Sequence, residues 1–294
     1  MQCRLLTQAD FKVYDDFLKP HTATSMFLRS NPLLVGMDFK NDRFHAHYYG
    51  LFDDDNELHG VIALCWNGNV FVQVPNARYL EPLFTYVRQQ KPDFVVKGVL
   101  GPDTQSRWIL DKTCITPDMC NMSSTESVFT MPLDAIHIPA ALMTGAWVSR
   151  RAQESDLETL TRWRRAYEVE ALGMPPEALP SYQETEATEL RSIKENTAFV
   201  LEVGGALVGC SKFSARLPDA VQIGGVYTPP EMRKQRYGRA CVAGSLLMAA
   251  DEGTKYACLF TTALATPTAY TAIGFRQVGS YHLTLLKEGV RLGA

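Results

Sequence analysis

The order of predicted secondary-structure elements constrains this chain most, because the same order occurs in both halves of its 294 residues. Apolar residues at alternate positions predict strands, and apolar residues every three to four positions predict helices. On this basis, residues 1–134 and residues 147–294 each contain a strand, two helices, three strands, a helix, a strand, a helix and a last strand. We therefore expect an α+β fold of two tandem domains, each a mixed, mostly antiparallel sheet flanked by helices.

Turn residues support this division. Asn67-Gly68 and Gly204-Gly205 each separate two apolar runs, as in a β-hairpin. Residues 135–146 are interrupted by Pro and Gly and have weak periodicity, which indicates a linker. The two halves are otherwise dissimilar in sequence, so the duplication depends on element order. Two unrelated α+β domains are the alternative.

Composition and charge exclude several classes of protein. The formal net charge is −3 and no domain is basic, so we expect neither nucleic acid nor a membrane as partner. The N-terminus lacks the apolar segment of a signal peptide, and no run reaches the roughly 18–20 apolar residues of a membrane span. Scattered cysteines in odd number, with no C-x-x-C pair, are typical of free thiols in the cytosol and predict neither a disulfide framework nor a metal site. The seven are Cys3, Cys65, Cys114, Cys120, Cys210, Cys241 and Cys258.

The stretch "YTPPEMRKQRYGRA" at residues 227–240 follows one predicted strand and begins a predicted helix. The first N–H groups of a helix lack partners within the helix, and the helix dipole adds positive charge there. Arg233, Lys234, Arg236 and Arg239 add further positive charge, so the stretch predicts a local site for phosphate. It matches neither the Walker loop nor the G-x-G-x-x-G dinucleotide motif. A solvated basic turn is the alternative.

This stretch resembles the coenzyme-binding motif of the GNAT superfamily, the GCN5-related N-acetyltransferases. The family pattern (Q/R)-x-x-G-x-(G/A) opens a helix, and the corresponding residues here are Arg233-Lys234-Gln235-Arg236-Tyr237-Gly238. Downstream, "AYTAIGFRQVG" is similar to a family motif in which a Tyr lies five residues before the Phe of a Gly-Phe pair; these are Tyr270, Gly274 and Phe275. The resemblance implies that residues 147–294 bind acetyl-CoA, and the two halves together resemble tandem-GNAT proteins such as mycothiol synthase.

The sequence also departs from the family pattern. Arg236 replaces the central glycine of the motif, and Ala263 replaces an Asn that often precedes the C-terminal helix. That helix, expected to begin at Thr266-Pro267, is short, and a hairpin is expected in residues 275–287. In the first half, "VPNARYLEPLF" stands in place of the coenzyme loop and contains no glycine. The resemblance therefore implies a degenerate first half that does not bind coenzyme.

The resemblance implies roles for main-chain groups. The N–H of Val226 would polarise the thioester carbonyl, and the backbone of Thr228 would pair with the pantetheine arm as an added strand does. Gly224-Gly225 indicates a bulge that would separate two strands at this point. The residues expected to bind acetyl-CoA are Val226, Tyr227, Thr228, Arg233, Lys234, Gln235, Arg236, Tyr237, Gly238, Arg239 and Ala240.

Acetyl transfer in this family goes directly from thioester to amine, so Cys241 and Cys258, in apolar runs, are interpreted as core residues. Tyr270 is the expected general acid for the leaving thiolate because it occupies the family's position, and a core tyrosine is the alternative. Glu168 and Glu170 are the candidate bases. Since they are two residues apart on a helix, at most one is expected to face the cleft, and each could be an ordinary surface carboxylate.

The resemblance therefore implies an N-acetyltransferase that moves an acetyl group from acetyl-CoA to a primary amine of a small molecule or peptide, without a metal. A non-catalytic acyl-CoA sensor or scaffold is the alternative. A nucleic-acid module is disfavoured, because no aromatic stacking platform lies beside the basic cluster. Trp163 and Tyr167, at helical spacing, are expected in the core rather than in an acceptor pocket. We expect a cytosolic monomer or homodimer.

Overall fold

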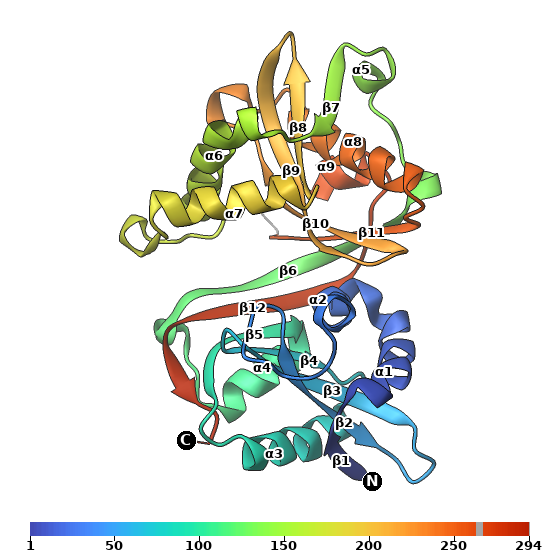
Figure 1. Ribbon diagram of the computed structural model, residues 1–294, viewed down its shortest axis with the longest axis vertical. Coiled ribbons are helices and arrows are strands. Elements are labelled where there is room, and N and C mark those ends of the chain that lie inside the picture. The colour runs from blue at the N-terminus through green and yellow to red at the C-terminus, as the bar shows by residue number, and fades with distance from the viewer. Residues whose placement is uncertain (263–266, 294) are drawn as a thin grey trace. The chain divides into compact units, whose positions relative to one another are not determined.

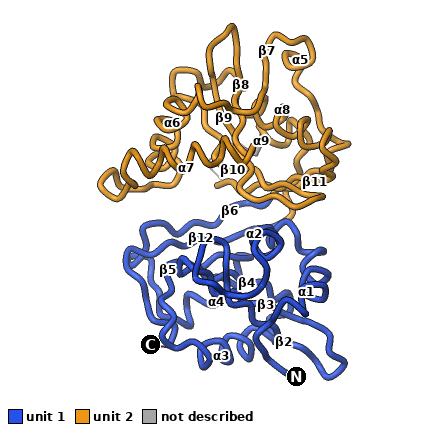
Figure 2. Tube along the Cα trace, viewed as in Figure 1, with its two compact units in different colours: residues 1–128, 279–294 blue, residues 129–278 orange. Residues whose placement is uncertain are grey.

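The computed structural model describes residues 1–262 and 267–293 (Figure 1). They form two compact units, coloured separately in Figure 2. Unit 1 comprises residues 1–128 and 279–294, and unit 2 comprises residues 129–278. Each unit contains parallel and antiparallel strand pairs with helices packed on them, which confirms the predicted α+β class with mixed, mostly antiparallel pairing.

The sheet of unit 1 has the strand order β1-β2-β3-β4-β5-β12-β6. Strands β4 and β5 are parallel, and the pairs β1–β2, β2–β3, β3–β4 and β5–β12 are antiparallel. The apolar stripe of α3, including Leu83 and Val87, packs on this sheet. The elements are β1 (Gln2–Leu5), α1 (Phe11–Leu18), α2 (Thr22–Val35), β2 (Ala46–Phe52), β3 (Leu58–Cys65), β4 (Asn69–Gln73), α3 (Leu80–Gln90), β5 (Val95–Pro102), α4 (Asp103–Lys112), β6 (Cys120–Pro132) and β12 (Arg276–Arg291).

The sheet of unit 2 has the strand order β6-β11-β10-β9-β8-β7. Strands β10 and β11 are parallel, and the pairs β7–β8, β8–β9 and β9–β10 are antiparallel. A one-turn helix, α5 (Ala140–Met143), lies in the expected linker. The other elements are β7 (Trp147–Arg151), α6 (Leu157–Glu170), α7 (Tyr182–Lys194), β8 (Ala198–Val203), β9 (Ala206–Arg216), β10 (Ala220–Tyr227), α8 (Tyr237–Asp251), β11 (Tyr256–Thr261) and α9 (Pro267–Thr271).

Strand alternation gives unit 2 two cores on opposite faces of its sheet. Phe199 of β8 packs with Val242 and Leu246 of α8. The next residue, Val200, packs with Leu160 of α6 on the other face. Helix α8 therefore covers one face and α6 the other, and the end of β10 lies between them.

Local turn signals predicted the hairpins and the start of α8 correctly. Asn67-Gly68 joins antiparallel strands β3 and β4, and Gly204-Gly205 joins β8 and β9. Gly68 has φ +85°, a conformation that favours glycine. Helix α8 begins at Tyr237, as the sequence indicates.

The end of the chain differs from expectation. The hairpin predicted in residues 275–287 is wrong, because β12 is one strand from Arg276 to Arg291 with an irregularity between Leu285 and Val290. Residues 279–294 belong to unit 1, where β12 pairs with β5, although they were expected in the second half. Conversely, residues 129–134 belong to unit 2 rather than to the first half. The two halves of the sequence thus exchange their last strands.

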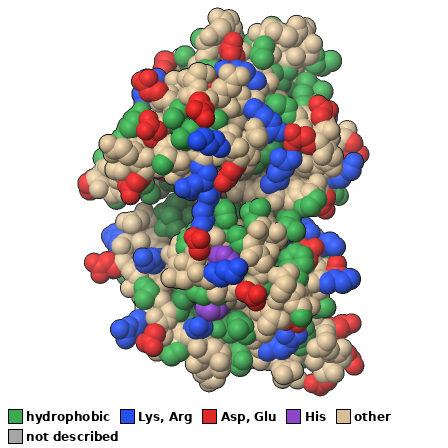
Figure 3. Space-filling view, viewed as in Figure 1, with side chains coloured by type: hydrophobic (Ala, Val, Ile, Leu, Met, Phe, Trp, Pro, Cys, Tyr) green, Lys and Arg blue, Asp and Glu red, His purple; other side chains and the backbone are tan. Residues whose placement is uncertain are grey.

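The surface carries both signs of charge. Figure 3 shows acidic and basic side chains mixed over the visible face of each unit. Within the described part of the chain, no helix combines the length and apolarity needed to cross a membrane.

All seven cysteines are free thiols, and their burial differs. Cys114 is exposed, whereas Cys65, Cys210, Cys241 and Cys258 are buried. Burial raises the pKa of Cys210 and of Cys258 to about 12, so these thiols stay protonated at neutral pH. Because the thiolate is the reactive form, burial makes them inert in the native protein.

We expect Ellman's reagent to modify Cys114 first in the native protein, Cys3 and Cys120 more slowly, and the four buried cysteines only on unfolding. The measurement is the time course of thionitrobenzoate release with and without denaturant. In Cys114→Ser the fast phase should be absent. A fast phase of the same amplitude in that variant would contradict the burial pattern.

Candidate active site

Strand β10 separates from β11 halfway along its length. Residues 220–223 pair with β11, and residues 224–227 have no partner there. The pairing with β9 is also interrupted between Gly224 and Tyr227, which places Gly225 and Val226 in a bulge, as predicted. Main-chain groups at the end of β10 are therefore available to another extended chain.

The two glycines differ in how firmly the structure requires them. Gly225 has φ +58°, which other residues rarely adopt, so a substitution there is strained. A Cβ at Gly224 would lie 2.0 Å from Oγ of Ser214, so a side chain there requires the Ser214 hydroxyl to move. The stricter requirement for glycine in the bulge is therefore at position 225.

The loop after β10 leads into α8 through two left-handed residues. Lys234 has φ +65° and Arg236 has φ +69°, and Arg236 is the N-cap of α8. The family's glycine at this position is explained by this conformation, which costs an L-residue about 1–2 kcal/mol. The Arg236 side chain makes no capping hydrogen bond, so the first N–H groups of α8 remain available to an anion.

Two cavities that share five lining residues lie along this loop and the free end of β10. The larger, of about 750 Å³, is lined by Tyr167, Glu170, Ala171, Val226, Tyr227, Thr228, Arg233, Gly238, Arg239, Thr262, Ala269 and Tyr270. The smaller, of about 360 Å³, is lined by Thr228, Met232, Arg233, Lys234, Arg236, Tyr237, Gly238, Arg239, Thr268 and Ala269.

Most of the residues predicted for coenzyme binding meet at these cavities, and two do not. Gln235 is exposed and lines neither of them. Ala240 is fully buried in α8 and packs in the core with Leu201 and Val208. A Cβ at Gly238 would lie 3.5 Å from Oγ1 of Thr228, an ordinary contact distance, and would border the space between α8 and the end of β10.

Arg233 connects the loop to α6. Its Nη2 forms an ion pair with Glu170, and its Nε donates to the carbonyl of Thr228 (3.0 Å). The Tyr227 hydroxyl also donates to Glu170 (3.3 Å). The hydrogen bond with Glu170 raises the pKa of Arg233. Glu170 therefore faces the larger cavity, but both of its oxygens are engaged.

Glu168 points elsewhere. It is buried, and its Oε1 accepts from Nε of Arg164 (2.7 Å). It lines neither cavity. The expectation that at most one of the two glutamates faces the cleft agrees with this placement, since only Glu170 does. Trp163 packs in the α6 core as expected, whereas Tyr167 also forms cavity wall, one turn before Glu170.

Tyr270, on α9, lines the larger cavity. Its ring meets Phe275 edge-on at 6.1 Å between centroids. Burial raises the pKa of Tyr270 to about 12, and Tyr167 and Cys241 add to this shift. The phenol is therefore protonated at neutral pH. Ala263 and Thr266, singled out in the sequence, lie outside the described residues.

Three of the four cationic side chains in the loop form no ion pair with the residues that the structure describes. Within residues 1–262 and 267–293, no ion-pair partner is present for Lys234, Arg236 or Arg239. All three side chains border the smaller cavity, beside the N-terminus of α8. Fold and site together place the free end of β10 beside three cationic side chains at the N-terminus of α8.

One acidic cluster lies outside this site. Ligand atoms of Asp53, Glu57 and His59 come within 4.8 Å of one another at the β2–β3 turn. The oxygens of Asp53 already accept hydrogen bonds from His59 (2.7 Å) and from the N–H groups of Asp55 and Glu57. The cluster is explained as turn structure, and the absence of a metal stays a prediction.

Comparison with known proteins shows a family match in the second half. Residues 158–275 match the family model described as acetyltransferase (GNAT) family. The matched segment contains all the residues that line the two cavities. Among curated proteins, none matches the sequence.

Solved structures extend the likeness in fold to nearly the whole chain. A Drosophila protein has 10% identity and a TM-score of 0.59, with 97% of this chain and 98% of that chain covered. A GCN5-related N-acetyltransferase from Sphaerobacter thermophilus has 14% identity and a TM-score of 0.58, with 96% and 94% covered. A GNAT-family acetyltransferase from Colwellia psychrerythraea has 13% identity and a TM-score of 0.50, with 97% and 99% covered. At these identities the likeness is one of fold.

We expect Arg236→Gly to raise the free energy of unfolding by about 1 kcal/mol, because glycine adopts φ +69° without strain. Arg239→Gly, which also removes one cation from the loop, is the matched control. Arg239 is helical, so its replacement should lower the free energy of unfolding by about 1 kcal/mol. Urea unfolding measures both. Equal destabilisation by the two substitutions would contradict the left-handed assignment.

Proposed function

We propose that unit 2 transfers an acetyl group from acetyl-CoA directly to a primary amine. The observation that carries this proposal is the free end of β10 beside a cationic loop at the N-terminus of a helix. An extended pantetheine arm can pair with the strand end while a diphosphate meets the N–H groups and cations. Free thiols favour a reducing compartment, so we place the enzyme in the cytosol.

The proposed reaction uses one main-chain N–H group and the phenol of one tyrosine. The N–H of Val226 polarises the thioester carbonyl, and the neutral amine of the acceptor attacks the carbonyl carbon. The C–S bond breaks as the amide C–N bond forms, and the Tyr270 phenol gives its proton to the leaving thiolate. The nitrogen releases one proton to solvent, and solvent returns a proton to the Tyr270 phenolate. The strand end at Thr228 holds the pantetheine arm. Lys234, Arg236 and Arg239 face the diphosphate.

Unit 1 has the same element order, but the corresponding main-chain groups form hydrogen bonds within the chain. The first residue after β4, Val74, donates its N–H to Oε1 of Gln105 (2.7 Å). The N-cap side chain of Asn76 accepts from the N–H of Arg78, where the helical segment begins. The groups that would receive coenzyme are therefore satisfied within the chain. We infer that unit 1 binds no coenzyme, as in a tandem arrangement similar to mycothiol synthase with one catalytic half.

Calorimetry with acetyl-CoA tests both proposals. We expect saturable binding with one acetyl-CoA per chain, followed by thiol release when amines are added. Two equivalents would contradict the inference about unit 1. Saturable binding without turnover of any amine would favour a sensor. Neither heat nor thermal stabilisation at millimolar acetyl-CoA would overturn the transferase proposal.

We expect Tyr270→Phe to lower kcat by a factor of about 10² to 10⁴, the usual contribution of a general acid, while the Kd for acetyl-CoA stays unchanged. Tyr256→Phe, at an exposed tyrosine, is the matched control and should retain wild-type kcat. Because the pKa of Tyr270 is about 12, its protonated form persists to high pH. We therefore expect no fall in kcat between pH 8 and about pH 10 from this group. Equal kcat for Tyr270→Phe and wild type would remove Tyr270 from the mechanism.

A further inference from the structure

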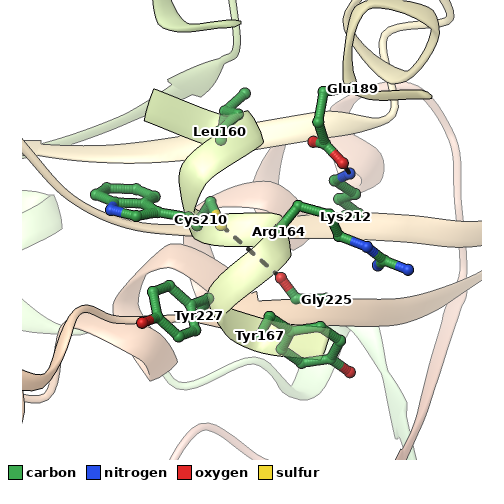
Figure 4. Close-up of a pocket in the computed structure, with 9 residues that line it drawn as sticks. Leu160, Arg164, Tyr167, Glu189, Cys210, Lys212, Gly225 and Tyr227 are labelled. Carbon is green, nitrogen blue, oxygen red and sulfur yellow. Dashed lines mark hydrogen bonds and ion pairs between the residues drawn. The ribbon is translucent and has the colours of Figure 1, made fainter. Parts of the chain in front are cut away.

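The space beneath the bulge of unit 2 has no room for an organic ligand. Figure 4 shows this cavity, with the Lys212 side chain of β9 reaching the Glu189 carboxylate of α7. Its volume is about 10 Å³, and a single water requires roughly 10–15 Å³. The two side chains are 13% and 0% exposed, so this ion pair is a buried wall of the cavity.

A cavity of about 500 Å³ lies at one end of the sheet of unit 1 and is called the unit 1 cavity below. Residues at the starts of β2, β4 and β5 and at the end of β3 border it. Cavities of about 300–1,000 Å³ have the size that holds small organic ligands. Val74, at the strand end that corresponds to the free end of β10, follows the opposite end of β4. The unit 1 cavity is therefore separate from the position that corresponds to the proposed coenzyme site.

Aromatic rings form much of the wall of the unit 1 cavity. Four half-buried residues with rings border it: Phe39, His47, Trp66 and Phe94. Phe39 and His47 stack with 4.0 Å between their ring centroids and 24° between their planes. Burial lowers the pKa of His47 to about 4, and the Lys91 ammonium adds to this shift, so the imidazole is neutral at pH 7. The wall thus offers flat, apolar surface to a ligand.

The main chain holds these rings in place. The N–H of Trp66 donates to the carbonyl of His45 (3.0 Å), and the N–H of Lys97 donates to the carbonyl of Gly68 (2.7 Å). Phe44 has φ +72°, a left-handed conformation that bulky residues rarely adopt, and its ring meets Trp66 edge-on at 5.9 Å between centroids. Residues in such conformations cluster at functional sites. A cavity whose wall is fixed in advance loses little conformational freedom when a ligand binds.

Two lysines give the unit 1 cavity positive charge. Lys91 and Lys97 border it, and neither has an ion-pair partner among the residues that the structure describes. Asp93 also borders the cavity, but it is 91% exposed and lies 3.8 Å from Arg291. The lysines therefore leave a net positive charge beside the aromatic rings, which favours an anionic ligand.

This charge suits a single carboxylate better than a phosphate. Lys91 is the C-cap of α3, where the last carbonyl groups of the helix carry partial negative charge. These carbonyl groups oppose a dianion more strongly than a monoanion. Of the described residues that line the cavity, none is an arginine that could form the bidentate hydrogen bonds typical of phosphate sites.

We propose that the unit 1 cavity binds an aromatic monocarboxylate. The rings of the ligand lie against Phe39, Trp66 and Phe94. Its carboxylate faces the ammonium groups of Lys91 and Lys97. Neither contact involves coenzyme or unit 2, so this site goes beyond the proposed acetyl transfer and does not depend on it.

Calorimetry with three probes of one carbon skeleton tests the class of ligand in the unaltered protein. 2-Naphthoate has both the flat rings and the charge, 2-naphthamide lacks the charge, and decahydro-2-naphthoate lacks the flat rings. We expect one 2-naphthoate to bind per chain, at least tenfold more tightly than either of the other probes. A preference below tenfold over either probe, or no saturable binding at millimolar 2-naphthoate, would overturn the proposal. Tighter binding of 2-naphthyl phosphate would overturn the choice of a monocarboxylate.

Paired lysine variants locate the probe on the protein. Lys91→Met combined with Lys97→Met removes both charges and keeps two unbranched side chains. We expect the Kd for 2-naphthoate to rise at least tenfold and that for 2-naphthamide to stay unchanged, so that the preference for the carboxylate is lost. Lys12→Met combined with Lys287→Met is the matched control, because both lysines are exposed in unit 1 and neither lines the cavity. The control should change neither Kd, and a preserved preference in the first double variant would overturn the assignment.

A ring variant tests the aromatic wall. Trp66→Leu replaces the indole by an apolar side chain without a ring. We expect the preference for 2-naphthoate over decahydro-2-naphthoate to fall at least threefold in this variant, while the preference for 2-naphthoate over 2-naphthamide stays. An unchanged preference for the flat probe would remove Trp66 from the site.

Saturating acetyl-CoA separates this site from the cationic loop of unit 2. We expect the same Kd for 2-naphthoate with and without acetyl-CoA. Displacement of 2-naphthoate by acetyl-CoA, together with no effect of the Lys91 and Lys97 variant, would place the probe in unit 2 and overturn the site in unit 1. Binding of 2-naphthoate that depends on these lysines, in a protein that does not bind acetyl-CoA, would remove the transferase proposal and retain the unit 1 site.

Discussion

The divergence of β10 from β11 is the constraint on which the site depends. If the two strands stayed paired to their ends, the N–H and C=O groups near Val226 would be used inside the sheet. Two adjacent glycines favour the interruption, because a Cβ at Gly224 would displace the Ser214 hydroxyl and Gly225 has positive φ. The coenzyme loop, the larger cavity and the space beneath the bulge all lie around this one interruption.

Unit 1 shows that the architecture alone does not provide this site. Its β4 and β5 are parallel neighbours in the same order as β10 and β11. There, Gln105 occupies the N–H of Val74, and Asn76 caps the turn before α3. In unit 1, two side chains therefore occupy main-chain N–H groups after the strand. In unit 2, the bulge at two glycines leaves main-chain groups at the strand end available. The structural difference between the two strand ends lies in a few local hydrogen bonds, and element order gives no information about them.

Sequence patterns predicted the features that neighbouring residues determine, and missed the contacts between residues far apart in the sequence. Hairpins at glycine turns, the start of α8 and the loop cations follow from neighbouring residues, and each was predicted in place. The exchange of last strands was not predicted. Hydrophobic periodicity identifies a strand but does not indicate the strand with which it pairs. Likewise Glu189 and Lys212 are 23 residues apart on different elements. The one available sign was a single lysine within the apolar strand run "VGCSKFSA".

Two of the ion pairs in unit 2, Arg233–Glu170 and Lys212–Glu189, differ in what a ligand can do to them. Arg233 and Glu170 are 45% and 40% exposed, and such a pair contributes about 0–1 kcal/mol, so a diphosphate can draw Arg233 away at little cost. Removing one member of a buried pair such as Lys212 and Glu189 costs about 3–5 kcal/mol. The coenzyme side of the site is therefore adaptable, whereas the wall beneath the bulge is fixed.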